Sequence, residues 1–139
     1  AMRIAQDLER VGDEATTIAR HALKLMADAP IALPTELLDE AVEATSMLTD
    51  AIDAFVRKDP ILARGIIPRD ESVDEWHEQL VAWLRGVILE DTGRLDQALS
   101  LMTVSRSLER VGDHATNIAE DVVFFCEAED IRHPGLRRT

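Results

Sequence analysis

The sequence predicts an all-α fold, an up-and-down antiparallel bundle of four long helices. The composition favours packing of Ala, Leu, Ile and Val between helices over a β-sandwich, because aromatic residues make up only 4% of the 139 residues and Tyr is absent. Apolar residues recur three and four positions apart over long segments, as on the buried face of a helix. Short connections between these segments make consecutive helices antiparallel neighbours around one core.

The first predicted helix runs to about Ala27, where the segment ADAPIALP interrupts the helical pattern. No Ser, Thr, Asp or Asn precedes its first apolar residue as a cap, so we expect the natural start of this helix to lie upstream of residue 1. Its apolar stripe consists of Ile4, Leu8, Val11, Ala15, Ile18, Ala22 and Leu25.

The second predicted helix begins near Pro34 and ends near Lys58. Proline is favoured in the first turn of a helix, and the cations Arg57 and Lys58 suit the negative end of the helix dipole. Its apolar stripe consists of Leu37, Ala41, Ala44, Leu48, Ala51 and Phe55.

Asp59 and Pro60 predict the cap and the first turn of a third helix, which continues to about Glu90. Pro68 lies inside this helix and should kink it, because proline has no backbone N–H to donate. The apolar stripe consists of Val73, Trp76, Leu80, Trp83 and Val87.

A short turn at residues 91–93 leads into a long fourth helix, and the chain from Asp130 onward is expected to be loop. Cys126, the single cysteine, lies at helical spacing among apolar residues, so we expect it to fill core rather than to act as a nucleophile. The stripe consists of Leu101, Val104, Leu108, Val111, Ala115, Ile118, Val122 and Phe125.

One string occurs twice, as LERVGDEAT at residues 8–16 and LERVGDHAT at residues 108–116. This repeat predicts a duplicated half-molecule, and if the repeat unit is helices two to four, the first helix is the last member of another unit. Gly12 and Gly112 each cost about 1 kcal/mol relative to Ala in a helix. We expect them to permit the close approach of a neighbouring helix or of a hydrated metal.

Acidic residues four positions apart occur on the flanks of two helices. Glu109, Asp113 and Asn117 point roughly 130–210° away from the centre of the apolar stripe at 100° per residue. Asp70 and Asp74 repeat the spacing in the third helix. These pairs are either solvated faces of an acidic protein or a metal site, because cations remove the mutual repulsion of carboxylates. Oxygen ligands without thiolates favour Mg, Mn, Ca or iron over structural zinc.

The chain carries 27 acidic against 15 basic residues, a formal net charge of −12. This charge repels phosphate backbones and anionic lipid heads, so no nucleic acid partner is expected. No apolar run approaches the roughly 18 residues of a membrane span, and one cysteine cannot form an internal disulfide, so a cytoplasmic location is expected. Four histidines show no HExxH spacing and are expected at the surface rather than as ligands: His21, His77, His114 and His133.

Several strings together resemble the PhoU family of phosphate-signalling regulators. They are LERVGDHATNIAED followed by FFCEAEDIRH, the segment RDESVDEW in the preceding helix, and the second LERVGD copy. That family has six helices in two similar three-helix bundles. By this resemblance, residues 1–28 are the last helix of an incomplete first repeat, and residues 34–139 are a complete second repeat with a C-terminal tail.

The resemblance also implies a function and a set of metal ligands. PhoU-like proteins are non-enzymatic adaptors, often homodimers, that couple the high-affinity phosphate ABC transporter to a sensor histidine kinase and hold down the phosphate-starvation response. They lie in the cytoplasm or peripherally at the inner membrane face. Their multinuclear metal clusters imply Fe, Mn, Mg or Zn here. The matching positions are Asp70 with Asp74, Glu109 with Asp113, Asn117 as a further ligand, and Glu9 with Asp13.

Two other classes of function are weighed against this one. A two-metal carboxylate site could hydrolyse phosphoesters, although the sequence shows no general base and no phosphate-binding glycine loop. A histidine phosphotransfer bundle would need an exposed acceptor on a helix, for which His114 is the candidate.

Overall fold

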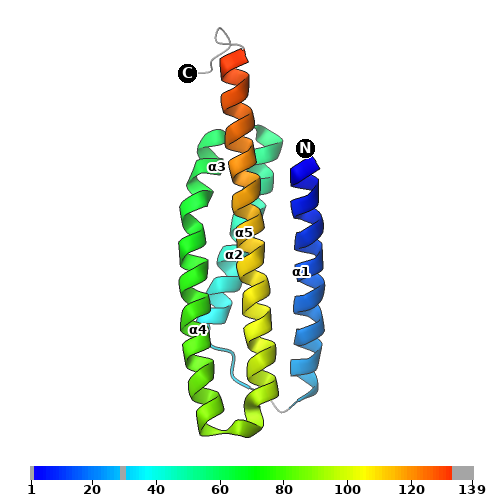
Figure 1. Ribbon diagram of the computed structural model, residues 1–139, viewed down its shortest axis with the longest axis vertical. Coiled ribbons are helices and arrows are strands. Elements are labelled where there is room, and N and C mark those ends of the chain that lie inside the picture. The colour runs from blue at the N-terminus through cyan, green and yellow to red at the C-terminus, as the bar shows by residue number, and fades with distance from the viewer. Residues whose placement is uncertain (1, 29–30, 133–139) are drawn as a thin grey trace.

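The computed structural model describes residues 2–28 and 31–132, and this part of the chain contains helices and no β-strand. The predicted all-α fold is therefore confirmed. Figure 1 shows the helices packed side by side along one common direction. Their bounds are α1 Met2–Ala27, α2 Thr35–Arg57, α3 Pro60–Ile66, α4 Asp70–Glu90 and α5 Leu95–Arg132, with 3-10 turns at Ile67–Arg69 and Thr92–Arg94.

Helix α5 is the centre of the bundle and packs against α1, α2, α3 and α4 (Figure 1). The chain descends along α1, returns along α2, descends along α4 and returns along α5, which extends past the other helices at its C-terminal end. Consecutive long helices are thus antiparallel, as the short connections predict. Since α1 and α4 lie on different sides of α5 (Figure 1), residues on different sides of α5 meet different neighbours.

Both ends of α2 lie within one residue of their predicted places. Pro34 precedes the helix in an extended conformation, and Lys58 ends it in the left-handed region with φ 54°. The Lys58 N–H donates to the carbonyls of Ala54 and Phe55, which satisfies groups that the end of a helix leaves unpaired.

The predicted third helix is divided in two at Pro68. The Asp59 side chain caps α3 by accepting hydrogen bonds from the backbone N–H groups of Ile61 and Leu62, both at 3.1 Å. The kink expected at Pro68 is a 3-10 turn, after which α4 begins at Asp70. Asp70 therefore stands in the first turn of α4.

Helix α5 continues three residues further than predicted, since the sequence predicts a loop from Asp130 and the helix ends at Arg132. The prediction of loop is wrong for residues 130–132, which are helical. The next proline is Pro134, and a helix normally ends before the residue that precedes a proline, so nothing in the sequence stops the helix at Asp130. The rest of the predicted tail lies outside the described residues.

The apolar stripe of α5 is buried from Leu101 to Val122 and joins two clusters of core side chains. Cys126 packs against one of these clusters, as predicted. Three predicted core residues are instead exposed over more than a third of their surface, because a stripe with 3.5-residue spacing drifts around a helix of 3.6 residues per turn. They are Phe55, Trp83 and Phe125.

Helix α1 is covered less completely than its stripe predicts. Ile4 is its only buried apolar side chain among the residues described, whereas Leu8 and Ala15 are exposed. The helix packs mainly against α5, and polar pairs carry much of this contact. The pairs are Arg3 with Asp121 (3.4 Å), Asp7 with His114 (2.8 Å), Glu14 with Arg110 (3.7 Å) and His21 with Ser100 (3.2 Å).

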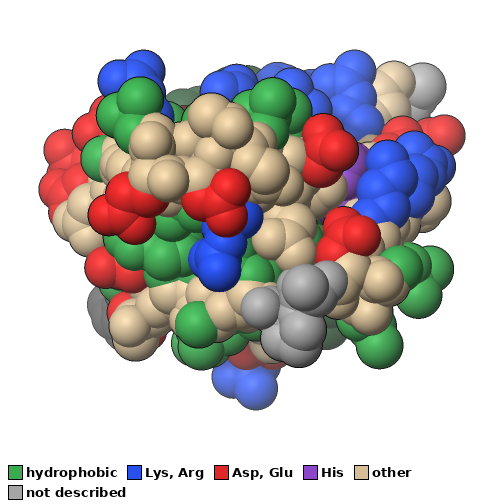
Figure 2. Space-filling view, turned by 90° about the horizontal axis from the view of Figure 1, so that it is seen from below, with side chains coloured by type: hydrophobic (Ala, Val, Ile, Leu, Met, Phe, Trp, Pro, Cys, Tyr) green, Lys and Arg blue, Asp and Glu red, His purple; other side chains and the backbone are tan. Residues whose placement is uncertain are grey.

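The end of the bundle that carries the α4–α5 turn has a mixed surface. Figure 2 shows acidic and basic side chains interspersed there with apolar ones, so the excess of acid does not form one continuous patch on this face. None of the described helices contains a stretch that is long and apolar enough to cross a lipid bilayer.

Candidate metal centre

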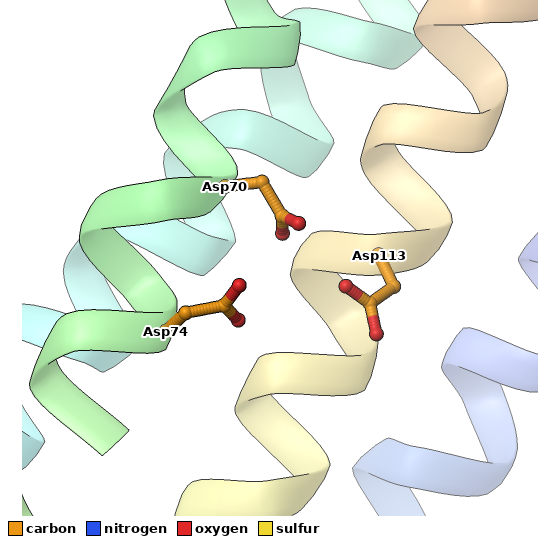
Figure 3. A group of neighbouring side chains, drawn as sticks. All are labelled: Asp70, Asp74 and Asp113. Carbon is orange, nitrogen blue, oxygen red and sulfur yellow. The ribbon is translucent and has the colours of Figure 1, made fainter. Parts of the chain in front are cut away.

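Three of the predicted carboxylates meet between α4 and α5. Asp70 and Asp74 extend from successive turns of α4 towards Asp113 on α5 (Figure 3). One oxygen atom of each side chain lies within 4.8 Å of the corresponding atoms of the other two. The i, i+4 spacing on α4 and the antiparallel packing of the two helices together produce this arrangement.

The start of α4 is anchored to α2 by Arg69, the residue before Asp70. The Arg69 guanidinium donates to Asp50 Oδ2 at 2.7 Å and to Ser46 Oγ at 2.8 Å, and it also pairs with Glu43. Arg69 is only partly exposed, so these bonds restrain the turn that follows Pro68. This restraint determines where Asp70 enters the site.

Gly112 leaves the space that Asp70 occupies. A Cβ atom at residue 112 would lie 3.3 Å from Asp70 Oδ1 and 3.7 Å from a methyl carbon of Val73. The expected reason for this glycine, close approach of a neighbouring helix, is thus confirmed. The same expectation is wrong for Gly12, where a Cβ would have no neighbour within 4 Å, because α1 has no such helix beside this turn.

The carboxylates raise one another's affinity for protons. Burial, together with the charges of Asp113 and Asp74 and a hydrogen bond with Asp113, raises the pKa of Asp70 to about 6. Burial, followed by the charge of Asp74, raises the pKa of Asp113 as well. Asp70 Oδ1 is buried and has no hydrogen-bond partner. An oxygen without a partner, a glycine recess and three converging carboxylates fit a hard cation.

Glu109 of α5 also interacts with Asp74 of α4. Burial, together with a hydrogen bond with Asp74 and the charge of Asp74, raises the pKa of Glu109 to about 7. The structure therefore brings three of the predicted residues together, Asp70, Asp74 and Asp113, and Glu109 adjoins them through its hydrogen bond with Asp74.

Three other predicted ligands lie elsewhere. The Asn117 amide donates to Asp7 Oδ1 of α1 at 3.4 Å instead of facing the carboxylates. Glu9 and Asp13 are exposed on α1. Thr17, which occupies the position of Asn117 in the first repeat, donates its hydroxyl to the Asp13 carbonyl.

Comparisons with known proteins agree with this architecture. Residues 37–122 match the PhoU domain family. This chain belongs to the PhoU domain family. A relative from Pseudomonas putida named phosphate-specific transport system accessory protein PhoU homolog is 39% identical over 134 residues, which cover 95% of this chain and 52% of the relative. The PhoU accessory protein of Escherichia coli (strain K12) is 34% identical, with 93% of this chain and 54% of that protein covered.

Solved structures of PhoU proteins share the fold. The crystal structure of PhoU from Pseudomonas aeruginosa matches with a TM-score of 0.84 and 34% identity, covering 91% of this chain and 60% of that one. The structure of the Streptococcus pneumoniae phosphate transport system regulatory protein PhoU matches with a TM-score of 0.81 and 27% identity, covering 92% and 60%. This chain thus spans just over half the length of the PhoU relatives, a family of accessory proteins rather than enzymes.

Sequence patterns missed three buried polar residues of this PhoU bundle: Glu40 on α2, His77 on α4 and Ser105 on α5. The Ser105 hydroxyl donates to Glu40 Oε2, and His77 Nδ1 lies 2.8 Å from Ser105 Oγ. One signal was available, since Glu40 lies three residues after Leu37 and four before Ala44 on the apolar face of α2.

The expectation of surface histidines is wrong at two positions. Burial lowers the pKa of His77, whose side chain lies between helices. The His114 side chain is only 12% exposed because it pairs with Asp7 of α1. Neighbouring helices cover both rings, which a pattern within one helix does not indicate. His133 lies outside the described residues.

Proposed function

We propose that this chain acts as a PhoU-type regulatory adaptor in inorganic phosphate homeostasis. It would couple the phosphate ABC transporter to a sensor histidine kinase and hold down phosphate uptake and the starvation response when phosphate is plentiful. The observation that supports this proposal is the family match over residues 37–122, together with relatives named as accessory proteins of the phosphate-specific transport system.

A pull-down tests the coupling. The purified chain is immobilised and offered the cytoplasmic segment of the kinase and, separately, the ATPase subunit of the transporter. We expect retention of each, with a bundle of similar size and charge from another family as the control. The proposal would be contradicted if the chain retained neither protein under conditions in which a full-length PhoU relative retains both.

We further propose that Asp70, Asp74, Glu109 and Asp113 hold metal ions, with Fe, Mn, Mg or Zn as the candidates. The convergence of Asp70, Asp74 and Asp113, the hydrogen bond of Glu109 with Asp74, the unpaired oxygen of Asp70 and the recess at Gly112 support this. A bound cation would replace the protons that the carboxylates otherwise share. The choice among these metals depends on availability as much as on ligand type.

Elemental analysis and metal titration test the site. We expect the chain to hold metal and a variant with all four residues changed to Ala to lose it. The matched control is Glu9→Ala with Asp13→Ala, which removes the same acidic spacing from the exposed face of α1. Equal metal binding by the parent chain and the four-residue variant would refute the site.

We also propose a homodimer located in the cytoplasm, at most peripherally associated with the membrane and without a nucleic acid partner. The net charge of −12 supports the last point. The exposed apolar residues of α1, such as Leu8 and Met26, support self-association.

The phosphotransfer alternative has little support from the geometry. A phosphate acceptor must be open to its donor, whereas His114 Nδ1 lies 2.8 Å from Asp7 Oδ1 in a largely covered position. Phosphoester hydrolysis is likewise without a supporting observation beyond the carboxylates themselves.

A further inference from the structure

The outer face of α2 carries a stripe of exposed side chains that no described helix covers. Five exposed residues follow one another at alternating intervals of four and three positions, the spacing at which side chains line one side of a helix for contact with another helix. At 100° per residue they span about 80° and point roughly 150° away from the buried face of α2. We call this set the α2 stripe. Its members are Leu38, Val42, Thr45, Thr49 and Ile52.

The two threonines of the α2 stripe have their hydroxyl groups satisfied within the helix. Thr45 Oγ1 donates to the Ala41 carbonyl at 2.7 Å, and Thr49 Oγ1 donates to the Thr45 carbonyl at 3.0 Å. The other three members are apolar, and Val42 is 70% exposed. Apolar side chains of a partner can therefore cover the α2 stripe without leaving one of its polar groups unpaired.

A groove of about 510 Å³ lies at the middle of the α2 stripe. Most of its lining side chains are short, so a bulky apolar side chain of a second helix can enter between them, as in the packing of ridges into grooves. The lining residues are Ala41, Val42, Thr45, Ser46, Thr49 and Asp50.

Acidic residues follow one border of the α2 stripe. Asp50 pairs with Arg69 at 2.7 Å, and Asp53 pairs with Arg57 at 3.0 Å. Asp39 is exposed and has no ion-pair partner within the described part of the chain. This border therefore keeps an excess of negative charge, which favours a cationic partner.

The opposite border of the α2 stripe is uncharged and consists of Ala41 and Leu48, both partly buried. A helix that lies on the α2 stripe thus meets acids along one side only. A second copy of α2 does not suit this surface, because it would bring either the same acids or the uncharged border against Asp39, and neither supplies a cation. A helix with Lys or Arg along one side of its apolar face does supply it.

We propose that the α2 stripe docks an amphipathic helix of a partner protein. The partner helix has apolar side chains at i, i+3, i+4 and i+7 and has Lys or Arg residues along one side of that row. Its apolar row provides the area that is buried against the α2 stripe, and its cations select the orientation in which it binds. This inference rests on the proposed adaptor function and assigns one contact surface to it.

Titrations with the kinase segment and the ATPase subunit test this surface. The parent chain and a variant with Val42→Gln and Ile52→Gln are each titrated against whichever protein the parent chain retains. We expect the variant to bind about tenfold more weakly or worse, because it loses two apolar contacts. The matched control is Leu89→Gln with Leu99→Gln, which removes two equally exposed apolar side chains from α4 and α5 and should leave the affinity unchanged.

Overlapping peptides of the retained protein test the chemistry of the partner. We expect the peptide that binds to be an amphipathic helix with basic residues along one side. Asp39→Lys should weaken its binding about two- to fivefold at low salt, and replacement of the facing Lys of the peptide by Glu should restore it. Asp13→Lys, at an exposed acid of α1, is the control and should have no effect. Restoration by exchange of charges decides the question if Val42→Gln with Ile52→Gln proves to be unfolded by circular dichroism.

The outcomes separate this inference from the adaptor function. Equal affinity of the parent chain and of Val42→Gln with Ile52→Gln would overturn the docking surface while the adaptor function stands. A binding peptide without basic residues, or self-association of the parent chain that these two substitutions abolish, would likewise overturn it, the latter because a second copy would then occupy the α2 stripe. A parent chain that retains neither protein would refute the adaptor function and the docking surface together.

Discussion

Gly112 and Gly12 occupy equivalent places in two copies of one string but have different surroundings. At residue 112 the absent side chain leaves room for Asp70 Oδ1 and Val73, whereas at residue 12 the space is empty. The same residue therefore makes room for a carboxylate of the proposed metal centre in α5 and only weakens the helix in α1.

Substitution of these two glycines by alanine should have different consequences. Gly12→Ala should stabilise the protein by about 0.5–1 kcal/mol, because Ala is the better helix former and meets no neighbour. Gly112→Ala should gain less or lose stability, since Asp70 must move away from the new methyl group, and it should weaken metal binding. Urea denaturation and metal titration of both variants measure this difference.

Equal stabilisation by the two alanines, with unchanged metal affinity, would show that Gly112 is not needed for the approach of Asp70. The comparison is internally controlled because both sites lie inside long helices and have the same neighbours in sequence from Leu to Asp.

The buried acids make the metal-free protein sensitive to pH. Burial, opposed by the Ser105 hydrogen bond, raises the pKa of Glu40 to about 8, and the charges of Glu109 and Asp74 act in the same direction as burial. The pKa of Glu109 is raised to about 7. The folded state therefore binds more protons than the unfolded chain, whose carboxyl pKa values stay near 4.5.

Stability should accordingly fall as the pH rises from about 6.5 to about 8 in the presence of a chelator. A carboxyl group whose pKa is raised by folding contributes stability that is complete below its pKa in the unfolded chain. This stability is lost as the pH rises through its pKa in the folded protein. His77 acts oppositely, since its lowered pKa costs stability below its ordinary value of 6.5, so the window above 6.5 isolates the acids. Melting temperatures across this range measure the slope, which Glu40→Gln should reduce. A stability that increases over this interval would contradict the assignment.

At the scale of the element, α1 is attached mainly to one neighbour through polar pairs. Asp7 is buried and accepts from the His114 ring and the Asn117 amide, while few apolar side chains of α1 are buried beside it. Such polar pairs stabilise the position of a helix only while both partners are present, because a buried polar group left without a hydrogen-bond partner costs free energy.

Asp7→Ala should therefore loosen α1 more than its size suggests. We expect a loss of about 1–3 kcal/mol, because His114 would remain largely covered without its partner. Hydrogen exchange should show faster exchange of α1 amides, with α4 and the middle of α5 little changed. Glu9→Ala, an exposed acid two residues away, is the control and should stay within about 0.5 kcal/mol. Similar effects of both substitutions would argue against the role of the Asp7 pairs.

At the scale of the whole molecule, one side of α1 has nothing packed on it in the described structure. Leu8, Ala15, Ala19 and Met26 are all exposed, and at 100° per residue they lie along one line of the helix. Such an apolar line on a helix surface commonly marks a contact with another chain.

The proposed homodimer should therefore depend on this line. Sedimentation velocity over a range of concentrations should show dimers of the parent chain, and Leu8→Gln with Met26→Gln should weaken them by about tenfold or more, or roughly 1.4 kcal/mol. Leu89→Gln, an equally apolar and more exposed site at the end of α4, is the control. A parent chain that stays monomeric at every concentration would refute the homodimer.

Sequence periodicity by itself determined the helices, because hydrogen bonding within a helix and its caps depend on residues a few positions apart. The ends of α2, the break at Pro68 and the flank positions of Asp70, Asp74, Glu109 and Asp113 were all predictable in this way. The 3.6-residue repeat of a helix fixes the angular position of each residue, so the sequence alone indicates which side of the helix a residue occupies.

Only the tertiary structure decided which sides meet. It joins Glu40 of α2 to Ser105 of α5, turns Asn117 towards Asp7, and leaves Glu9 and Asp13 exposed on α1 even though their sequence matches the other copy. The physical reason is that burial and the separation of charges depend on the packing of different helices, which identical local patterns do not specify.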